Sequence, residues 1–367
     1  MRVVLVGDAL HGERLAFDVY DQGGRLLLAS GSVLTPRYVR ELLARGYRSI
    51  GIVDPLAPDV RQTEPLRAQT RDQATRTVTR CLTSVREHSG GIQSAGILAV
   101  IEDILRCIQT SGALAVNLLS LRSTETELFT HSVNVCAYTL LLASDSDLGL
   151  DRVDLRHLGI GALLHDIGKI FCMDLVSRPG PLSPEEHQRL RRHTVDGFEW
   201  LRRQQEVDLR SAHVAFQHHE RLDGSGYPRG LSGEQIHPWA RLVAVADCYD
   251  AATADHPGSN CRPPHLVLAE LEAEAAAGRL DRRFTSLLRT RVAAYPVGSI
   301  LRLASGEIAI VVAQTEAGPD RPRFRVLADA QLTRIAPEER DAGPGGPDTE
   351  IAEVLPDYPQ ALLDGTA

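Results

Sequence analysis

The residues best suited to chemistry form a short run at positions 163–169, Leu-Leu-His-Asp-Ile-Gly-Lys. An imidazole, His165, stands beside a carboxylate, Asp166, and the amine of Lys169 follows about one helical turn later. Because neighbouring side chains on a helix point about 100° apart, His165 and Asp166 reach one ion only if the backbone bends, or if the carboxylate bridges two ions. The ammonium of Lys169 lies on the same predicted face, where it can meet a phosphate oxygen. The alternative interpretation is a buried helix end with a hydrogen-bonded histidine and a salt bridge.

Further histidines and carboxylates occur in the same part of the chain. Glu127 and His131 are four residues apart, so they share one face of a predicted helix. Asp247 follows the apolar run 242–246, and a carboxylate in such a setting needs a cation. The set contains no thiol, which favours iron or manganese in a multinuclear site, with zinc less favoured. In chain order the candidates are Glu127, His131, His165, Asp166, Lys169, His193, His218, His219 and Asp247.

Length and composition limit the classes of protein to consider. A chain of 367 residues predicts roughly two to three domains, and 43% hydrophobic residues allow packed cores. No run approaches the ~18 apolar residues of a membrane span, so we expect a cytoplasmic protein. The net charge of -8 argues against a partner that is a nucleic-acid polymer. The six cysteines include no C-x-x-C pair, which argues against a disulfide framework and a zinc-thiolate site.

Four longer motifs carry a resemblance to a known family. They are H-S-V-N-V at 131–135, L-L-H-D-I-G-K-I at 163–170, H-H-E-R-L-D-G-S-G-Y-P at 218–228 and A-D-C-Y-D-A at 246–251. From about residue 126 to 254 the chain resembles the HD-GYP family of bacterial cyclic di-GMP phosphodiesterases. The resemblance implies a mainly α fold with a helical HD-superfamily core, a small N-terminal α+β unit and a short C-terminal β appendage.

The resemblance also implies a ligand set and a metal. Asp166 would bridge two ions, and family members that hold a third metal carry a carboxylate at the position of Glu127. We therefore expect two or three transition-metal ions, iron or manganese first, with zinc, nickel or magnesium as alternatives. The implied metal ligands are Glu127, His131, His165, Asp166, His193, His218, His219 and Asp247.

The substrate contacts follow from the same resemblance. Lys169 would lie against the scissile phosphate and act in catalysis with Asp166. The Gly-Tyr-Pro loop would lie beside the substrate, or would present a surface to signalling proteins such as those of diguanylate-cyclase type. At 256–259 this chain has His-Pro-Gly-Ser where the family usually has an R-P-Y-R-like phosphate clamp, so substrate affinity should be altered. The predicted substrate contacts are Lys169, Gly226, Tyr227, Pro228, Asp250 and His256.

Together these observations predict a metal-dependent phosphodiesterase that hydrolyses cyclic di-GMP to pGpG, and to GMP after a second cut. The complete ligand set favours this enzyme. The altered clamp favours two alternatives, a catalytically weak or inactive cyclic di-GMP receptor, and an HD phosphohydrolase for another nucleotide.

The patterning of apolar residues sets the expected domain boundaries. A helical stripe from Ala74 to Val85 needs a partner, either the next helix or a second subunit, so a homodimer is one expectation. Thr35 and Pro36 predict a helix start in the first unit. The expected parts are a small α+β unit at 1–57, a linker and helical segment at 58–117, the HD-GYP phosphohydrolase domain at 118–295, a short β appendage at 296–335 and a disordered tail at 336–367.

Overall fold

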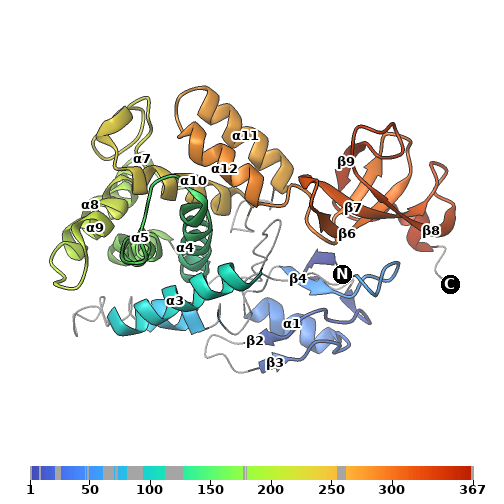
Figure 1. Ribbon diagram of the computed structural model, residues 1–367. Coiled ribbons are helices and arrows are strands. Elements are labelled where there is room, and N and C mark those ends of the chain that lie inside the picture. The colour runs from blue at the N-terminus through green and yellow to red at the C-terminus, as the bar shows by residue number, and fades with distance from the viewer. Residues whose placement is uncertain are drawn as a thin grey trace.

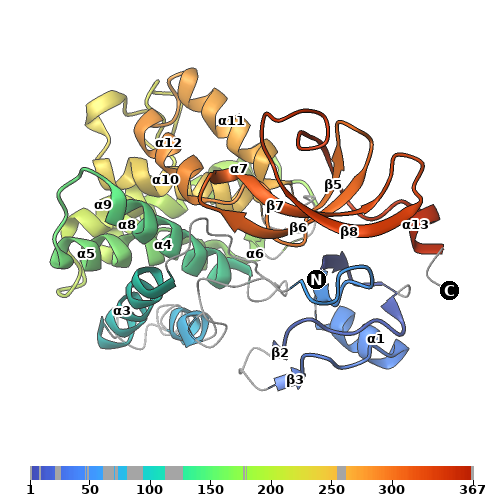
Figure 2. The same cartoon turned by 45° about the vertical axis from the view of Figure 1, so that its right-hand side comes forward.

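The computed structural model has a helical body, a small N-terminal unit and a C-terminal antiparallel sheet (Figure 1). This arrangement confirms the predicted fold class. The two smaller units lie beside each other, away from α8 and α9 of the helical body (Figures 1 and 2). The structure describes residues 2–7, 10–20, 26–45, 47, 49–60, 70, 73–80, 94–111, 127–176, 178, 180–253 and 262–364.

Capping residues visible in the sequence mark where helices of the body begin. Asp151 caps α5 by accepting hydrogen bonds from two backbone N–H groups. Ser183 and Glu186 form a capping box at the start of α7, where Pro184 takes the first helical position. The elements are α3 (Ser94–Ser111), α4 (Glu127–Asp145), α5 (Arg152–Leu163), the 3-10 helix η2 (Ile167–Cys172), α6 (Met173–Val176), α7 (Pro184–Arg191), α8 (His193–Leu201), α9 (Leu209–Gln217), η3 (Gly233–Gln235), α10 (Pro238–Thr253), α11 (Pro264–Ala276) and α12 (Arg282–Arg291).

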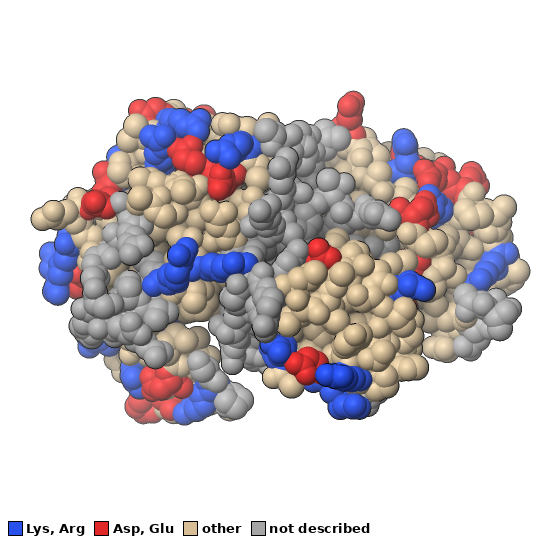
Figure 3. Space-filling model, turned by 90° about the horizontal axis from the view of Figure 1, so that it is seen from below, with Lys and Arg blue, Asp and Glu red and all other residues tan. Residues whose placement is uncertain are grey.

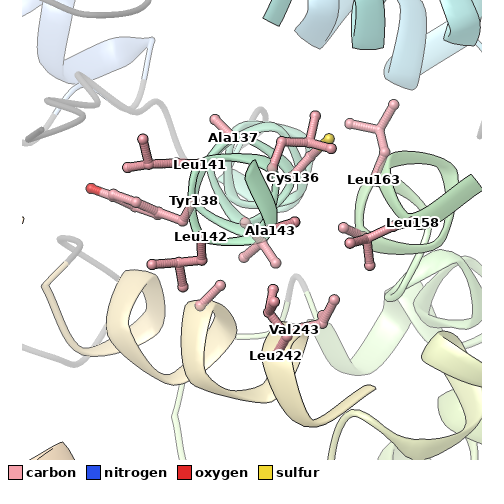
Figure 4. Packing of buried hydrophobic residues seen from close by; sticks show 14 of the residues in the cluster. Cys136, Ala137, Tyr138, Leu141, Leu142, Ala143, Leu158, Leu163, Leu242 and Val243 are labelled. Atoms are coloured by element: carbon pink, nitrogen blue, oxygen red, sulfur yellow. The ribbon is translucent and has the colours of Figure 1, made fainter. Parts of the chain in front are cut away.

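Helix α4 is the central helix of the body and is buried on all sides from residue 130 to 143. Figure 4 shows it in cross-section, with Leu158 and Leu163 of α5 on one side and Leu242 and Val243 of α10 on another. From Val135 to Ala143 every residue except Thr139 is apolar or Tyr, and a helix that is apolar on all sides is buried in this way. Because α4 and α10 carry candidate ligands and α5 leads directly into His165 and Asp166, this core fixes the backbone from which those ligands project.

The N-terminal unit combines two short two-stranded sheets with one helix. Strand β1 (Arg2–Leu5) pairs with β4 (Ser49–Ile52), and β2 (Val19–Tyr20) pairs with β3 (Leu26–Leu28). Helix α1 (Pro36–Ala44) begins where the sequence predicts, because the Thr35 hydroxyl accepts a hydrogen bond from the Tyr38 N–H at 3.2 Å.

The amphipathic stripe that begins at Ala74 finds its partner within the chain. Residues 73–80 are helical, and Ala74 and Val78 are buried in the same apolar cluster as Ile97 and Ile101 of α3. The described part of the stripe therefore packs on the next helix. The rest of it, from Cys81 to Val85, lies outside the described residues.

The C-terminal sheet is larger than the sequence predicts. It has the strand order β8-β7-β6-β5-β9, all antiparallel, followed by the short helix α13 (Gln360–Asp364). Its strands are β5 (Ile300–Leu303), β6 (Ile308–Thr315), β7 (Gly318–Ala328), β8 (Arg334–Asp341) and β9 (Ile351–Leu355).

The prediction of a disordered tail from residue 336 is wrong for the described residues up to 364. Strand β8 is polar and largely exposed, so its composition resembles that of a disordered segment. Its backbone pairs with β7 at the sheet edge, where Arg323 and Arg325 of β7 form ion pairs with Asp341 and Glu339 at 2.7 and 2.8 Å. These cross-strand partners precede β8 in the chain, so the tail's own composition does not reveal them.

Residues 54–60, at the predicted boundary between the first unit and the linker, are packed against the C-terminal sheet. Ala57 and Val60 are buried in the same apolar cluster as Ile308 of that sheet. The buried carboxylate of Asp54 accepts hydrogen bonds from two backbone N–H groups, and from the Tyr358 hydroxyl at 3.1 Å. Parts of the chain about 300 residues apart therefore share one core.

Replacing Tyr358 with Phe should lower the free energy of unfolding by about 1–3 kcal/mol, because the buried Asp54 carboxylate loses a hydrogen-bond donor. Urea unfolding followed by circular dichroism measures this loss. Tyr38, whose side chain is exposed on α1, provides the control Tyr38→Phe, which should change the unfolding midpoint little. Equal effects of the two substitutions would contradict the assignment.

No described helix is both long enough and apolar enough to span a membrane. On the face drawn in Figure 3, the described basic and acidic side chains lie interspersed. Such mixing of charges is the usual character of a solvated protein surface.

Candidate metal centre

Five histidines and two aspartates from separate elements come together in the helical body. His131 lies on α4, and His165 and Asp166 occupy the turn between α5 and η2. Because α5 ends at Leu163, the backbone bends at this pair. A bend is one of the two arrangements that would let His165 and Asp166 reach one ion. The ligand atoms form two groups, each within 4.8 Å of one another: Asp166, His193, His218 and His219 in one, and His131, His165 and Asp247 in the other.

Backbone carbonyl groups fix the orientation of three of these rings. The Nδ1 atoms of His165, His193 and His218 each lie near the carbonyl oxygen three residues earlier, at 2.8, 2.7 and 3.0 Å. A carbonyl oxygen only accepts hydrogen bonds, so each Nδ1 carries the proton and donates it. In a neutral ring Nε2 then presents a lone pair, the arrangement that metal-binding histidines use.

These Nε2 atoms face the carboxylate of Asp166. Oδ1 lies 3.2 Å from Nε2 of His193 and 3.6 Å from that of His218, while Oδ2 lies 3.4 Å from Nε2 of His165. Nε2 of His165 and Oδ1 of Asp166 are buried and form no hydrogen bond with any described residue. Lone pairs this close to a carboxylate need a cation between them, so the residues fit a metal ion. The two oxygens of Asp166 face different groups, as a bridging ligand requires.

Asp247 spans the two groups in a similar way. Its Oδ1 atom lies 3.0 Å from Nε2 of His131 and 3.8 Å from Nε2 of His165, and its Oδ2 atom lies 3.9 Å from Nδ1 of His219. The carboxylate that the sequence places in an apolar run is thus surrounded by imidazoles. A cation bound at this place would stabilise the buried, negatively charged carboxylate.

Asp250 is predicted as a substrate contact, and the structure places its carboxylate beside His131. Its side chain is buried, one oxygen lies 2.8 Å from Nδ1 of His131, and the other accepts a hydrogen bond from Nδ2 of Asn134 at 2.9 Å. Asp250 therefore orients His131 from behind, as carboxylates commonly do for ligand histidines. Sequence reasoning missed this role, and also that of Asn134. The available signal was the spacing, since Asn134 lies three residues after His131 on one helix face.

Burial and neighbouring charges set the protonation of the cluster. Burial lowers the pKa of His218 to about 4, and burial together with His218 holds the pKa of His219 well below its ordinary value. Both rings are therefore neutral at pH 7, as metal ligation requires. Burial would lower the pKa of His131, but hydrogen bonds with Asp247 and Asp250 outweigh it and raise that pKa to about 9. A metal ion at His131 would compete with a proton.

The Lys169 ammonium lies next to the candidate bridging carboxylate. It donates a hydrogen bond to Oδ2 of Asp166. Burial would raise the pKa of Asp166, but Lys169 and His165 together hold it well below its usual range. Asp166 is therefore a carboxylate at any ordinary pH, and Lys169 stays charged, because Asp166 raises its pKa against the effect of burial.

The Gly-Tyr-Pro loop is held against the cluster. A Cβ on Gly226 would lie only 2.4 Å from the backbone nitrogen of Arg221, so only glycine fits there. The Tyr227 ring, next to the cis Tyr227–Pro228 bond, lies 4.7 Å from the His219 ring. Sequence reasoning missed Glu220, a buried carboxylate that accepts hydrogen bonds from two backbone N–H groups of this loop, both at 2.9 Å. Its position directly after His219 was the available signal.

The structure does not describe the side chains at three predicted positions. Glu127 begins α4, one turn before His131, but its side chain is not described. His256 and Ser259, in the altered clamp, lie between α10 and α11 in a segment outside the described residues. Their roles stay predictions.

The helical fold and its histidine-aspartate cluster define an HD domain, and residues 117–284 match that family. The chain is 33% identical over 270 residues to cyclic di-GMP phosphodiesterase PA4108 of Pseudomonas aeruginosa, an alignment that covers 72% of this chain and 64% of that protein. It is 41% identical over 136 residues to a cyclic di-GMP phosphodiesterase of Thermotoga maritima, covering 36% of each. It is also 35% identical over 177 residues to 3'3'-cGAMP-specific phosphodiesterase 1 of Vibrio cholerae, covering 47% of this chain and 39% of that protein.

Residues 117–284 are thus an HD domain, and the Gly-Tyr-Pro loop beside the cluster marks this part of the chain as one of the HD-GYP type. The chain spans about two thirds of the length of the Pseudomonas relative, and under two fifths of the lengths of the other two.

Proposed function

We propose that this chain is a metal-dependent phosphodiesterase that hydrolyses cyclic di-GMP to pGpG, and to GMP after a second cut. One observation carries the proposal: the Nε2 atoms of His165 and His193 face Asp166, and Nε2 of His165 and Oδ1 of Asp166 are buried without a hydrogen bond to any described residue. The names of the Pseudomonas and Thermotoga relatives support cyclic di-GMP as the substrate.

The proposed ligands are His193, His218 and His219 for one ion and His131, His165 and Asp247 for another, with Asp166 between them. Seven nitrogen and oxygen donors without sulfur suit iron or manganese. Such ions, when bound, lower the pKa of water toward neutrality and stabilise negative charge on a phosphoryl group.

Within the chain, Lys169 is the residue placed to act on the substrate. Its charged ammonium lies at the edge of the cluster, with a side chain 22% exposed, whereas that of Asp166 is 2% exposed. A phosphate seated at the cluster would therefore come within reach of Lys169. The ammonium can neutralise charge that develops on the non-bridging phosphate oxygens during attack, and its hydrogen bond to Asp166 holds it in place.

A second candidate substrate is 3'3'-cGAMP, because the Vibrio relative carries that specificity in its name. The two molecules share the cyclic dinucleotide ring and differ in one base. Parallel assays with both substrates distinguish these candidates. Binding of either one without turnover would instead favour the receptor interpretation, which the altered clamp at His256 and Ser259 suggests.

Location and protein partners follow from the proposed substrate. A cyclic dinucleotide signal acts in the cytoplasm, which is the location we expect. Signalling proteins of diguanylate-cyclase type are the proposed partners of the surface that Tyr227 and Pro228 form.

Metal analysis tests the proposed centre directly. Protein purified anaerobically with iron or manganese should hold at least two ions per chain. A wild-type protein that holds less than one ion per chain under those conditions would end the metal-dependent proposal.

Glu127 is expected to supply a third metal position, because it lies one helical turn before His131. Replacing Glu127 with Ala should lower the metal content by one ion per chain and leave the other two ions bound. Atomic absorption of the purified variant measures this change. An unchanged metal content would show that Glu127 is not a ligand.

A further inference from the structure

Arg191 ends α7 two residues before the candidate ligand His193, and its guanidinium lies over the ring of Tyr227. The guanidinium carbon is 4.9 Å from the centre of that ring. The Tyr227 ring is in turn 4.7 Å from the His219 ring, at an interplanar angle of 31°. A cation is therefore held one aromatic ring away from the candidate metal centre.

The charge of Arg191 is available to a ligand. Its neighbours are paired, since Arg189 contacts Asp174 at 2.7 Å and Arg192 contacts Asp196 at 3.7 Å. Arg191 itself is exposed and forms no ion pair with the part of the chain that the structure describes.

Other arginines near the cluster are less available. Arg221 donates hydrogen bonds to two backbone carbonyl oxygens of its own segment, and Arg262 forms an ion pair with Glu270. Arg229 lies over the ring of Phe216, 4.8 Å from its centre, and that ring contacts Phe198 and His213, neither of which is a candidate ligand. Arg191 is thus the arginine that is both stacked beside the cluster and without a carboxylate partner in the described residues.

The cluster is open to solvent near Arg191. The side chain of His219, which contacts Tyr227, is 20% exposed, whereas those of His165 and His218 are fully buried. A substrate that reaches the cluster past His219 would meet Tyr227 and Arg191 with the part that extends beyond the cluster.

We propose that Arg191 binds the second phosphodiester of the substrate, the one that is not being cut. This inference rests on the proposed function. A cyclic dinucleotide carries two phosphodiesters on opposite sides of its ring, so one phosphate at the metal centre places the other outside it. A guanidinium forms two parallel hydrogen bonds with such a phosphate, and stacking on Tyr227 restricts its motion before binding. Arg191 would thereby compensate for the basic residues missing at His256 and Ser259.

The test compares Arg191→Met with Arg192→Met, the neighbouring exposed arginine, on two substrates. Cyclic di-GMP has two phosphodiesters, and bis(p-nitrophenyl) phosphate has one. For Arg191→Met, KM for cyclic di-GMP should rise about tenfold or more with little change in kcat, because one charge-assisted contact is lost. The loss of kcat/KM should be at least tenfold greater for cyclic di-GMP than for the one-phosphate substrate. Arg192→Met should behave as wild type.

Metal analysis of each variant separates the remaining outcomes. Equal losses on both substrates, or a reduced metal content, would show that Arg191 acts by supporting Tyr227 and the centre, and would overturn the proposal. An unchanged KM for cyclic di-GMP in an active enzyme would overturn this inference alone. A wild type that cuts bis(p-nitrophenyl) phosphate but neither binds nor cuts cyclic di-GMP would overturn the proposed function as well.

Discussion

Replacing Asp166 with Asn should remove most of the bound metal and abolish phosphodiesterase activity. The amide has one oxygen in place of two and no charge, so it cannot bridge two ions. Its NH₂ group can instead donate a hydrogen bond to a histidine Nε2 lone pair that now faces Asp166. Metal affinity should fall by more than about 100-fold, because loss of a group that merely supports a ligand already costs about 10–100-fold.

Asp174 provides a matched control for this substitution. It lies on α6, eight residues further along, and its exposed carboxylate pairs with Arg189. Asp174→Asn should keep the full metal content and activity. Metal analysis and phosphodiesterase assays on both variants, with circular dichroism to confirm folding, complete the comparison. A metal-replete, active Asp166→Asn variant would exclude Asp166 as the bridging ligand.

Replacing Gly168 with Ala should destabilise the protein and weaken metal binding together. A Cβ at this position would lie 2.0 Å from the carbonyl oxygen of His193 and 2.7 Å from the backbone nitrogen of Gly197. Both atoms belong to the backbone of α8, so the helix that begins with His193 must move away from η2. Overpacking of this kind costs about 1–3 kcal/mol, and the shift displaces His193 from Asp166.

Gly343 provides the corresponding control. A Cβ there meets no atom within 4 Å, so Gly343→Ala should be nearly neutral. Thermal unfolding with and without added manganese measures both effects, because a bound ion stabilises the folded state by an amount that grows with the logarithm of its affinity. If Gly168→Ala unfolds at the wild-type temperature and gains the same stabilisation from manganese, the close packing of η2 on α8 does not hold the site.

The sequence predicts much of the candidate site, because its residues lie within long motifs on strongly patterned helices. His165 and Asp166 stand at the end of an apolar helix, and Asp247 stands within another, so their types and surroundings are visible in the chain. The sequence does not show how those side chains are oriented. Asp250 is predicted as a substrate contact from the resemblance, but the packing of α10 against α4 places its carboxylate 2.8 Å from Nδ1 of His131.

Two parts of the fold could not be predicted from the sequence for a similar reason. The polar strand β8 is held by cross-strand pairs with β7, and the segment around Asp54 is held by Tyr358, about 300 residues away. Both depend on contacts distant in the chain, whereas the start of α1 at Thr35 depends on a contact three residues away and was predicted correctly. The stacking of Arg191 on Tyr227 is another distant contact of this kind.

The most direct test of the central claim is chromatographic analysis of cyclic di-GMP incubated with metal-loaded wild-type protein. We predict that cyclic di-GMP disappears as pGpG forms, that a chelator stops the reaction, and that added iron or manganese restores it. Unchanged cyclic di-GMP in the presence of protein shown to hold two or more ions per chain would contradict the claim.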